Sequence, residues 1–388
     1  MKSERRIDMS QKLLFIGNYT DEATYQIITQ HEIRDLSQAA RLFQNRLINS
    51  LVDKVDDFQA ISVLPTNKEI ELPKNVAGTK IKVEVIPIVN GSLESAIRVM
   101  RSIRNLIREC GKDTKVLMYA VNPIAIIPLL RLKKKYNLAL VTICPELPQF
   151  RRYKKSVKNG IKRKVFDYFN RRFDKYIVFA EDMQEYLPKG KPCMLLEGFA
   201  PETVQKPQVR EKNIAMYAGG LAEDNGIRMM IEAAHKSRLI DELWICGVGE
   251  CQEEVKSATD KKVKYLGRLT NSEVLSYEKQ AKVLLNVRNP QNDLTRFSFP
   301  SKVLEYMAAG GIVISSELRG IPAEYNEYIE LLKDYSPNGL AEAMDKIFGM
   351  DDSLFLKKTE SASAFVTGKG PNQRAADVKA FIEHGDSK

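Results

Sequence analysis

Three side chains on one face of a predicted helix are the part of this chain best suited to bind an anionic ligand. Ser301, Lys302 and Glu305 lie at positions i, i+1 and i+4 within FSFPSKVLEYMAAGGIVISS, residues 297–316. A helix start attracts anions through its unpaired N–H groups and its dipole, and a hydroxyl and a cation add to that attraction. A carboxylate about one turn further along, ~5 Å away, is placed to accept hydrogen bonds from sugar hydroxyls. The spacing outlines a nucleoside diphosphate, but it equally fits a surface helix with a Lys302–Glu305 pair worth about a few tenths of a kcal/mol.

The elements that would position this face are a loop, a short helix and a buried strand. Pro300 suits the first turn of a helix, where its missing N–H group would have no partner in any case. Gly310 and Gly311 are expected to end the helix because glycine adopts positive φ without strain. The GIVISS run that follows is short and β-branched, which predicts a strand.

The composition predicts a globular chain of about two domains. Of its 388 residues, 44% are hydrophobic, which is enough for two cores. We expect no signal peptide, and the longest apolar run, residues 116–132, is shorter than a membrane-spanning helix and contains two prolines. Five scattered cysteines without a C-x-x-C indicate a reducing cytoplasm, and the three histidines have no metal-ligand spacing. We therefore expect neither a metal nor a bound cofactor.

Most of the positive charge is concentrated in one segment. Residues 151–175 hold eleven Lys or Arg against two Asp, so they carry nine of the ten net positive charges. Apolar residues between 157 and 173 make this a basic amphipathic helix, which favours an anionic membrane surface at about 1 kcal/mol per near-surface cation. The alternative is a solvated helix packed on its own domain, and no stacking platform or motif supports nucleic acid. The residues predicted for membrane or acceptor contact are Arg151, Arg152, Lys154, Lys155, Lys158, Lys162, Arg163 and Lys164.

Strands alternate with helices along the first half, which predicts an α/β domain with a parallel sheet and right-handed crossovers. Gly17 and Asn18 end the first strand and are expected to form a loop that faces the ligand cleft. The predicted strands cover residues 12–18, 58–65, 81–87, 116–121, 138–144, 176–181 and 193–199, and the predicted helices include 33–52 and 93–110.

A second alternation of strands and helices begins after a proline-containing linker at residues 200–213. Ligands of such sheets lie beyond the carboxyl ends of the strands, and with two domains the expected site is the cleft between them. We predict a first domain over 1–205, a second over 206–366 and a final helix within 367–388 that packs back on the first domain. The predicted strands here are 213–220, 243–249, 262–269, 281–288, 311–316 and 329–332, and the predicted helices include 226–236, 271–280, 336–349 and 351–366.

Three stretches of the second half carry a resemblance to a known family. They are MYAGGLAEDNGI, KVKYLGRLTNSEVLSYEKQAKVLLNVRNP and FSFPSKVLEYMAAGGIVISSELRGIPAEY. The chain resembles bacterial glycosyltransferases of the GT-B type, in the group-1 set of capsule and exopolysaccharide pathways with a PSK–EYMA–G region. The resemblance is specific over residues 213–328 and weaker in the first half. It implies two Rossmann-like domains, and transfer of a sugar from a UDP- or GDP-type donor to a glycan acceptor in cell-surface polysaccharide synthesis.

The resemblance also implies roles for individual residues. Glu305 would bind the donor ribose, and Ser301 and Lys302 would hold its diphosphate. The other implied donor-binding residues are Gly219 and Gly220 through backbone N–H groups, Arg288 as a second cation, and Gly267 and Arg268 beside the nucleobase.

Two departures from the wider family concern charge. Phe297 stands where the family often has a first glutamate, and Gly220 and Asn225 lie where it often has an arginine and a lysine. Lys302 and Arg288 are therefore expected to carry more of the phosphate charge.

Transfer requires stabilisation of two opposite charges. Breaking a sugar–phosphate bond leaves negative charge on the phosphate, which preorganised donors stabilise, and an oxocarbenium-like sugar. The chain has no Asp-x-Asp, so Lys302, Arg288 and helix N-termini are expected to replace a metal. The resemblance implies retention at the anomeric carbon. No general base is assigned; the acids at predicted strand ends are Asp21, Glu22, Glu146 and Glu197.

The sequence leaves alternatives to this function. A basic helix suits a cytoplasmic enzyme held on the inner face of the cell membrane beside a lipid-linked acceptor. A sugar-nucleotide epimerase of the same fold would need no such helix. A non-catalytic sugar-nucleotide or glycan-binding subunit also fits the departures at Phe297 and Gly220.

Overall fold

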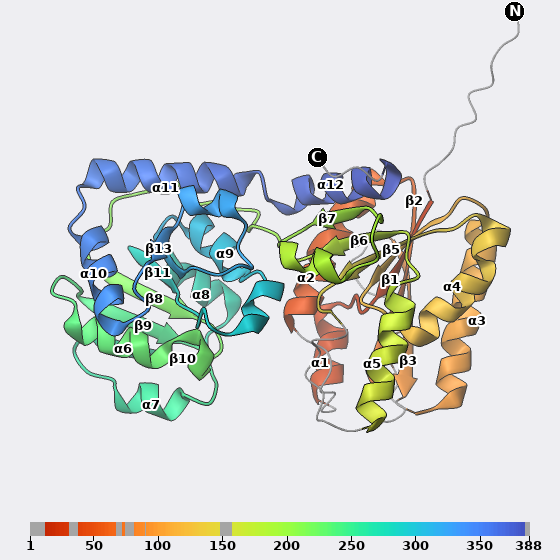
Figure 1. Ribbon diagram of the computed structural model, residues 1–388, viewed down its shortest axis with the longest axis horizontal. Helices are drawn as coiled ribbons and strands as arrows, with labels where there is room; N and C mark the ends of the chain where they lie inside the picture. The colour runs from red at the N-terminus through yellow and green to blue at the C-terminus, as the bar shows by residue number, and fades with distance from the viewer. Residues whose placement is uncertain are drawn as a thin grey trace, which may run out of the picture. The chain divides into compact units, whose positions relative to one another are not determined.

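The chain folds into two units that each contain one parallel β-sheet (Figure 1). The computed structural model describes residues 12–30, 38–66, 72–73, 81–89, 91–147 and 157–384. The first unit comprises the described parts of Met1–Phe179, Met183–Leu196 and Pro371–Lys388, and the second comprises Ala180–Asp182 and Glu197–Gly370. The predicted fold class, α/β with two parallel sheets, is confirmed.

The sheet of the first unit has seven strands in the order β3-β2-β1-β4-β5-β6-β7. Leu13, Leu14, Phe15 and Ile16 are all buried, although successive side chains point to opposite faces, so both faces of β1 are covered. The strands are β1 (Lys12–Gly17), β2 (Asp57–Thr66), β3 (Lys82–Val89), β4 (Lys115–Tyr119), β5 (Ala139–Cys144), β6 (Lys175–Val178) and β7 (Cys193–Leu195).

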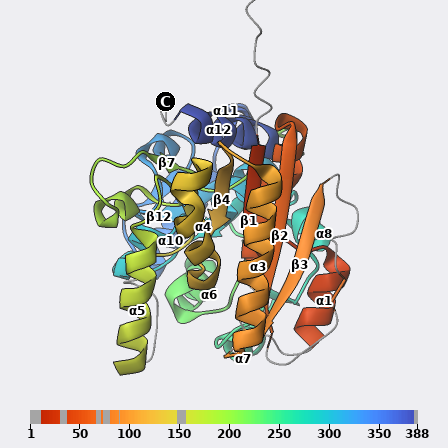
Figure 2. The ribbon, with the colours of Figure 1, turned by 90° about the vertical axis from the view of Figure 1, so that its right-hand side faces the viewer.

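Two helices of the first unit, α3 and α4, begin at polar caps. Ser92 accepts a hydrogen bond from the Ser95 N–H at the start of α3, and Asn122 accepts one from the Ile124 N–H at the start of α4. α3, α4 and α5 lie side by side (Figure 2). The α-helices are α1 (Glu22–Gln30), α2 (Gln38–Leu51), α3 (Leu93–Cys110), α4 (Pro123–Tyr136), α5 (Val157–Asn170) and α12 (Pro371–His384).

The last helix, α12, belongs to the first unit. It packs against α2. The ammonium of Lys175, the first residue of β6, donates hydrogen bonds to the carbonyls of Phe381 (2.9 Å) and Ile382 (2.7 Å). A cation at these carbonyls favours the C-terminal end of a helix, so this contact fastens α12 to the sheet.

The sheet of the second unit has six strands in the order β10-β9-β8-β11-β12-β13. The chain builds β8, β9 and β10 outward on one side, then returns to place β11 beside β8 and continues to the other edge. The strands are β8 (Ile214–Ala218), β9 (Glu242–Cys246), β10 (Val263–Gly267), β11 (Val283–Asn286), β12 (Ile312–Ser316) and β13 (Glu330–Leu332).

Two apolar cores cover the two faces of this sheet. Ala215 and Tyr217 of β8 pack in one core with α6 and α10, while Met216 and Ala218 pack in the other with α9 and α11. This alternation follows the two-residue repeat of a strand. The α-helices are α6 (Ile227–Lys236), α7 (Gln252–Ser257), α8 (Asn271–Glu278), α9 (Lys302–Ala309), α10 (Pro337–Phe348) and α11 (Asp352–Thr367).

Most predicted elements are present, usually shortened at their ends. The predicted strands at 213–220 and 281–288 are β8 and β11, whose ladders end at Ala218 and Asn286. The final residues of those predicted strands instead form the loops at the strand ends. Two helices, α1 and α7, were not predicted from the sequence. α7 has only six residues, too few for a helical repeat to stand out.

Candidate functional site

The second sheet reverses its strand order between β8 and β11. In parallel α/β sheets this switch point leaves a crevice beyond the carboxyl ends of the two strands, because their following loops run to opposite sides. Gly219 and Gly220 follow β8, and Arg288 lies two residues after β11. The fold therefore brings these predicted residues to the same edge of one sheet.

Helix α9 presents the predicted Ser301, Lys302 and Glu305 face. The first turn is tightened, because the Val303 N–H donates to the Pro300 carbonyl at 2.9 Å. Within the described part of the chain, the N–H groups of Ser301 and Lys302 have no acceptor, and Ser301 is exposed. This end of α9 can therefore donate to an anion.

The two glycines that end α9 do so for different reasons. Gly310 adopts φ +79°, as predicted for a helix-ending glycine. Gly311 is not among the glycines with positive φ; a Cβ there would lie 2.9 Å from the Ala281 carbonyl oxygen, so close backbone approach requires it.

Tyr306 anchors α9 to the end of β8. Its hydroxyl accepts a hydrogen bond from the Ala218 N–H (3.0 Å) and donates one to the Ala218 carbonyl (3.3 Å). The side chain is fully buried, and burial raises the pKa of Tyr306 well above its usual value, so the phenol stays protonated. No sequence pattern pointed to Tyr306, yet it sets the position of Lys302 and Glu305 relative to the strand end.

Lys302 lies between two carboxylates. Its ammonium is 2.9 Å from Glu305 Oε2 and 3.6 Å from Glu278 Oε1. The side chains of Lys302, Glu305 and Glu278 are 33%, 16% and 0% exposed, respectively. Burial lowers the pKa of Lys302, but Glu305 and Glu278 outweigh it and hold that pKa above its usual value. Lys302 is therefore a charged but compensated cation.

Glu278 was missed by the sequence analysis. It is the last residue of α8, and neither carboxylate oxygen makes a hydrogen bond within the described part of the chain. A signal was present, because Glu278 stands four residues after Val274, whose side chain packs in the core beside α9. A glutamate that shares a helix face with a residue of the core is directed toward that core, which indicates a buried charge.

Arg288 differs from Lys302 in having no counter-charge among the residues that the structure describes. Among the described residues it has neither a carboxylate partner nor a hydrogen bond, and it is half-buried. Burial lowers the pKa of Arg288, while the phenols of Tyr217 and Tyr306 raise it. An unpaired guanidinium in such a place favours a ligand that brings negative charge.

The two glycines after β8 are not equivalent donors. The Gly219 N–H donates to the Cys246 carbonyl at 3.1 Å, so it is used within the fold. The Gly220 N–H has no acceptor among the residues described. The Gly220 carbonyl accepts hydrogen bonds from Tyr217 Oη and Asn225 Nδ2, both at 2.8 Å, which fix the loop.

Gly267 and Arg268 lie further away than the other predicted residues. They stand at the end of β10, the edge strand, which is two strand spacings (~10 Å) from β8. Gly267 adopts φ +73°, and Arg268 is exposed. These two residues border the end of the sheet without joining the group around α9.

Phe297, eight residues before Glu305, belongs to the core. It is buried at the end of a 3-10 helix, Asp293–Phe297, and the guanidinium of Arg296 lies 5.0 Å from its ring centroid. Arg296 in turn pairs with Asp182 at 2.7 Å. The position therefore offers a ligand no carboxylate.

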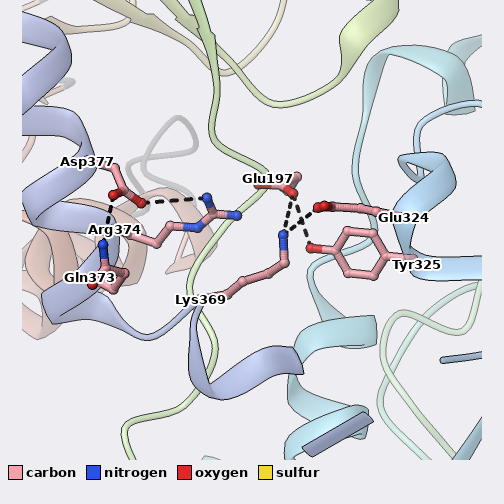
Figure 3. A network of polar contacts seen from close by, with 7 residues as sticks. All are labelled: Glu197, Glu324, Tyr325, Lys369, Gln373, Arg374 and Asp377. Carbon is pink, nitrogen blue, oxygen red and sulfur yellow. Dashed lines mark hydrogen bonds and ion pairs between the residues drawn. The ribbon is translucent and has the colours of Figure 1, made fainter. Parts of the chain in front are cut away.

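Three of the four acids considered as general bases make hydrogen bonds or ion pairs within the fold. Glu197 Oε1 accepts hydrogen bonds from Tyr325 Oη and Lys369 Nζ, both at 3.2 Å, and Lys369 also contacts Glu324 at 2.6 Å (Figure 3). In the first unit, Asp21 accepts from the Thr24 N–H at 2.6 Å, and Glu22 pairs with Arg41 at 2.6 Å. Glu146, after β5, adds to the effect of burial in raising the pKa of Tyr119. No general base is assigned.

The polar groups of the loop after β1 make hydrogen bonds to residues of the first unit. The Asn18 N–H donates to Gln44 Oε1 (2.7 Å), and the Asn18 side-chain amide donates to the Val63 carbonyl (2.5 Å). A Cβ on Gly17 would collide with the side chain of Gln44. Gly17 and Asn18 thus lie at the predicted strand end but are engaged within the first unit.

The predicted basic patch falls partly on α5. Arg151, Arg152, Lys154 and Lys155 lie outside the described residues, as does the side chain of Lys158. Lys162, Arg163 and Lys164 are exposed on α5. Beside them Ile161, Val165 and Tyr168 are 59%, 39% and 53% exposed, whereas Phe173 is buried. None of the described helices is both long and apolar enough to cross a membrane.

One family model matches part of the chain. The family model of group 1 glycosyl transferases matches residues 212–349, within the second unit. No curated protein matches the chain significantly. Together with the fold, the family match supports a glycosyltransferase with a GT-B architecture.

Solved structures show the same fold at low sequence identity. Sucrose-phosphate synthase from Thermosynechococcus elongatus is 12% identical, with a TM-score of 0.65 over 96% of this chain and 98% of that one. The lipopolysaccharide outer core galactosyltransferase WaaB is 13% identical, with a TM-score of 0.64 over 96% and 99%. HepE from Anabaena, solved with UDP and glucose, is 14% identical, with a TM-score of 0.61 over 95% and 99%.

Proposed function

We propose that this protein transfers a sugar from a nucleotide-diphosphate donor to a glycan acceptor, with the donor held by the second unit. One observation carries the proposal. Arg288, which has no carboxylate partner among the described residues, follows β11 at the switch point, where α9 begins with free N–H groups and carries a carboxylate, Glu305, one turn along the helix. Cations and free N–H groups suit a diphosphate, and a carboxylate suits the two hydroxyls of a ribose. HepE, a structure of the same fold, holds UDP.

The residues would divide the work by charge. Glu305 would accept hydrogen bonds from the ribose hydroxyls, and Ser301, Lys302 and the Gly220 N–H would face the diphosphate. Arg288 would neutralise charge on the leaving phosphate as the sugar–phosphate bond breaks. We propose that these groups act without a metal and that the anomeric configuration is retained.

The acceptor side is proposed from α5. Ile161, Val165 and Tyr168 at i, i+4 and i+7 share one helix face, and all three are exposed beside Lys162, Arg163 and Lys164. An apolar stripe bordered by cations suits the interface of an anionic bilayer. We propose a lipid-linked acceptor in cell-surface polysaccharide synthesis, reached from the cytoplasmic face of the membrane.

A thermal-shift screen tests the donor site, because a ligand that binds only the folded state raises apparent stability. UDP-glucose, UDP-galactose and GDP-mannose are compared for the wild type and for Arg288→Ala. We expect at least one donor to raise the Tm of the wild type and none to raise that of the variant. Release of nucleoside diphosphate only with a lipid-linked acceptor would establish transfer. Binding without turnover on any acceptor would favour a non-catalytic binding subunit instead.

Sedimentation with vesicles tests the membrane contact. The wild type should pellet with vesicles that contain phosphatidylglycerol and stay in solution with phosphatidylcholine alone. Replacing Lys162, Arg163 and Lys164 by Gln should release it, whereas the same change at the exposed Lys357 and Lys358 of α11 should not. Unchanged sedimentation of the α5 variant would contradict the proposal.

A further inference from the structure

A fully buried carboxylate lies beneath the donor site without a hydrogen bond. Glu278 is 0% exposed, and neither of its oxygens has a hydrogen-bond partner within the described chain. Its nearest compensating charge is the Lys302 ammonium, 3.6 Å from Oε1. Burying an ionised carboxylate with so little compensation is costly, so the group requires an explanation.

The titratable neighbours of Glu278, which ends α8, lie on two other elements. Lys302, Glu305 and Tyr306 lie on α9, and Cys246 ends β9. Burial raises the pKa of Cys246 to about 11, and burial also raises that of Tyr306, so both stay protonated at neutral pH. Of the chain's three histidines, His235 and His384 lie on α6 and α12, and His31 falls outside the described residues.

The two carboxylates beside Lys302 face different environments. Glu305 is partly exposed and is the residue proposed to bind ribose, whereas Glu278 is sealed from solvent. When ribose hydroxyls occupy Glu305, its 2.9 Å contact with Lys302 must be shared. Glu278 is then the charge that decides how much of the Lys302 charge is available to the diphosphate.

We propose that Glu278 is a proton-linked counter-ion of Lys302: together with Glu305 it compensates the ammonium charge in the empty site, and it takes up a proton when an anionic diphosphate binds. The inference rests on the proposed donor site. Protonation removes one of the two negative charges beside Lys302 and leaves the ammonium compensated by Glu305 alone, so that it attracts the phosphates more strongly. Glu278 thus acts through Lys302 and is a positioning residue, not a catalytic one.

The electrostatics give the direction of the linkage. Burial raises the pKa of Glu278 to about 7, with Lys302 lowering it and Glu305 raising it. Glu278 is therefore divided between its two forms near neutral pH. Added phosphate charge disfavours the ionised carboxylate and raises its pKa further, so binding takes up a proton. Donor affinity must then fall as pH rises.

Calorimetric titration of the full chain with UDP-glucose, UDP-galactose and GDP-mannose measures this linkage. These donors have doubly esterified diphosphates, so they lack the phosphate group that titrates near pH 6 in a monoester. If binding raises the pKa of Glu278 by ~1, affinity falls about fivefold between about pH 6 and about pH 8. Buffers of different ionisation enthalpy should show uptake of about half a proton at about pH 7.5.

Glu278→Gln separates this role from a structural one. The neutral amide mimics the protonated acid, so the variant should bind a donor about fivefold more tightly than the wild type at about pH 8, with no pH slope. A carboxylate that only supported the fold would give weaker binding. Glu342→Gln is the control: Glu342 is exposed on α10, a helix that packs on the other face of the sheet from α9. This variant should keep the wild-type dependence of donor affinity on pH.

The outcomes separate the two proposals. Donor binding that is independent of pH in the wild type, or a slope that persists in Glu278→Gln, overturns the role of Glu278 and leaves the donor site standing. Failure of all three donors to bind at either pH overturns the donor site and this inference with it. If Glu278→Gln does not fold, proton uptake by the wild type in the two buffers still decides the question.

Discussion

The two sheets have equivalent switch points, but the side chains beyond them differ in charge and in hydrogen bonding. Beyond β1 and β4 in the first unit, neutral amides satisfy one another: Asn18 contacts Gln44 and Val63, and Gln44 is fully buried. Beyond β8 and β11 in the second unit, Arg288 has no counter-charge among the described residues, and Lys302 shares two carboxylates. The same topology thus gives a strand end whose polar groups are hydrogen-bonded in the first unit, and a strand end with an uncompensated arginine among the described residues in the second. Topology supplies a place for a ligand, and side chains decide which ligand fits.

The largest effect is expected from the charged face of α9. Lys302→Ala and Glu305→Ala should each abolish measurable sugar transfer, a loss of at least about a hundredfold, because each removes a proposed contact to the donor. The fold should survive, since Glu278 can take up a proton once its counter-ion is gone. Assays of sugar transfer with circular dichroism as a folding control check this. Wild-type activity from Lys302→Ala would contradict its role at the phosphates.

Arg288→Ala should weaken donor binding about a hundredfold. A hydrogen-bonded pair with a charged group contributes about 1.5–3 kcal/mol, and Arg288 has no protein partner in the described chain to lose. Stability should therefore change little while affinity, measured by calorimetry with UDP-glucose, falls. Arg228→Ala is the matched control, because that exposed arginine of α6 pairs with Glu223, which precedes the helix, and with Glu254 of α7.

Tyr306→Phe tests whether the Tyr306 hydroxyl fixes α9 in the position that the proposed donor site requires. The variant loses both contacts to Ala218 and leaves a buried N–H unpaired, at a cost of about 1–3 kcal/mol. The Tm should fall by several degrees, and donor affinity should fall severalfold because α9 is less firmly placed. An unchanged Tm would show that the hydroxyl does not hold the helix.

The smallest effect on donor binding is expected from the first unit. Gln44→Leu removes the acceptor of the Asn18 N–H and should destabilise the fold by about 1–3 kcal/mol. Donor affinity should stay within about twofold of the wild type, because this end of the sheet is satisfied internally. A loss of UDP-glucose binding comparable to that of Arg288→Ala would overturn the contrast between the two units.

Local pattern was sufficient for much of the fold. β-branched runs located the strands, and Pro300 and Gly310 marked the ends of α9, because these signals depend on a residue and its near neighbours. The polar face of Ser301, Lys302 and Glu305 followed from helical spacing alone. The length of each strand could not be predicted from spacing, because hydrogen bonding between two strands ends where the shorter strand ends.

The sequence by itself determined the two α/β domains, the order of their elements and the polar helix face that we propose as the nucleoside-diphosphate site. The tertiary structure decided how charge is distributed around that face. It placed Glu278 of α8 under Lys302 of α9, fastened Tyr306 to Ala218 across 88 residues, and left Arg288 without a partner among the described residues. These relations depend on how helices pack over a sheet, and packing joins side chains that no local spacing connects.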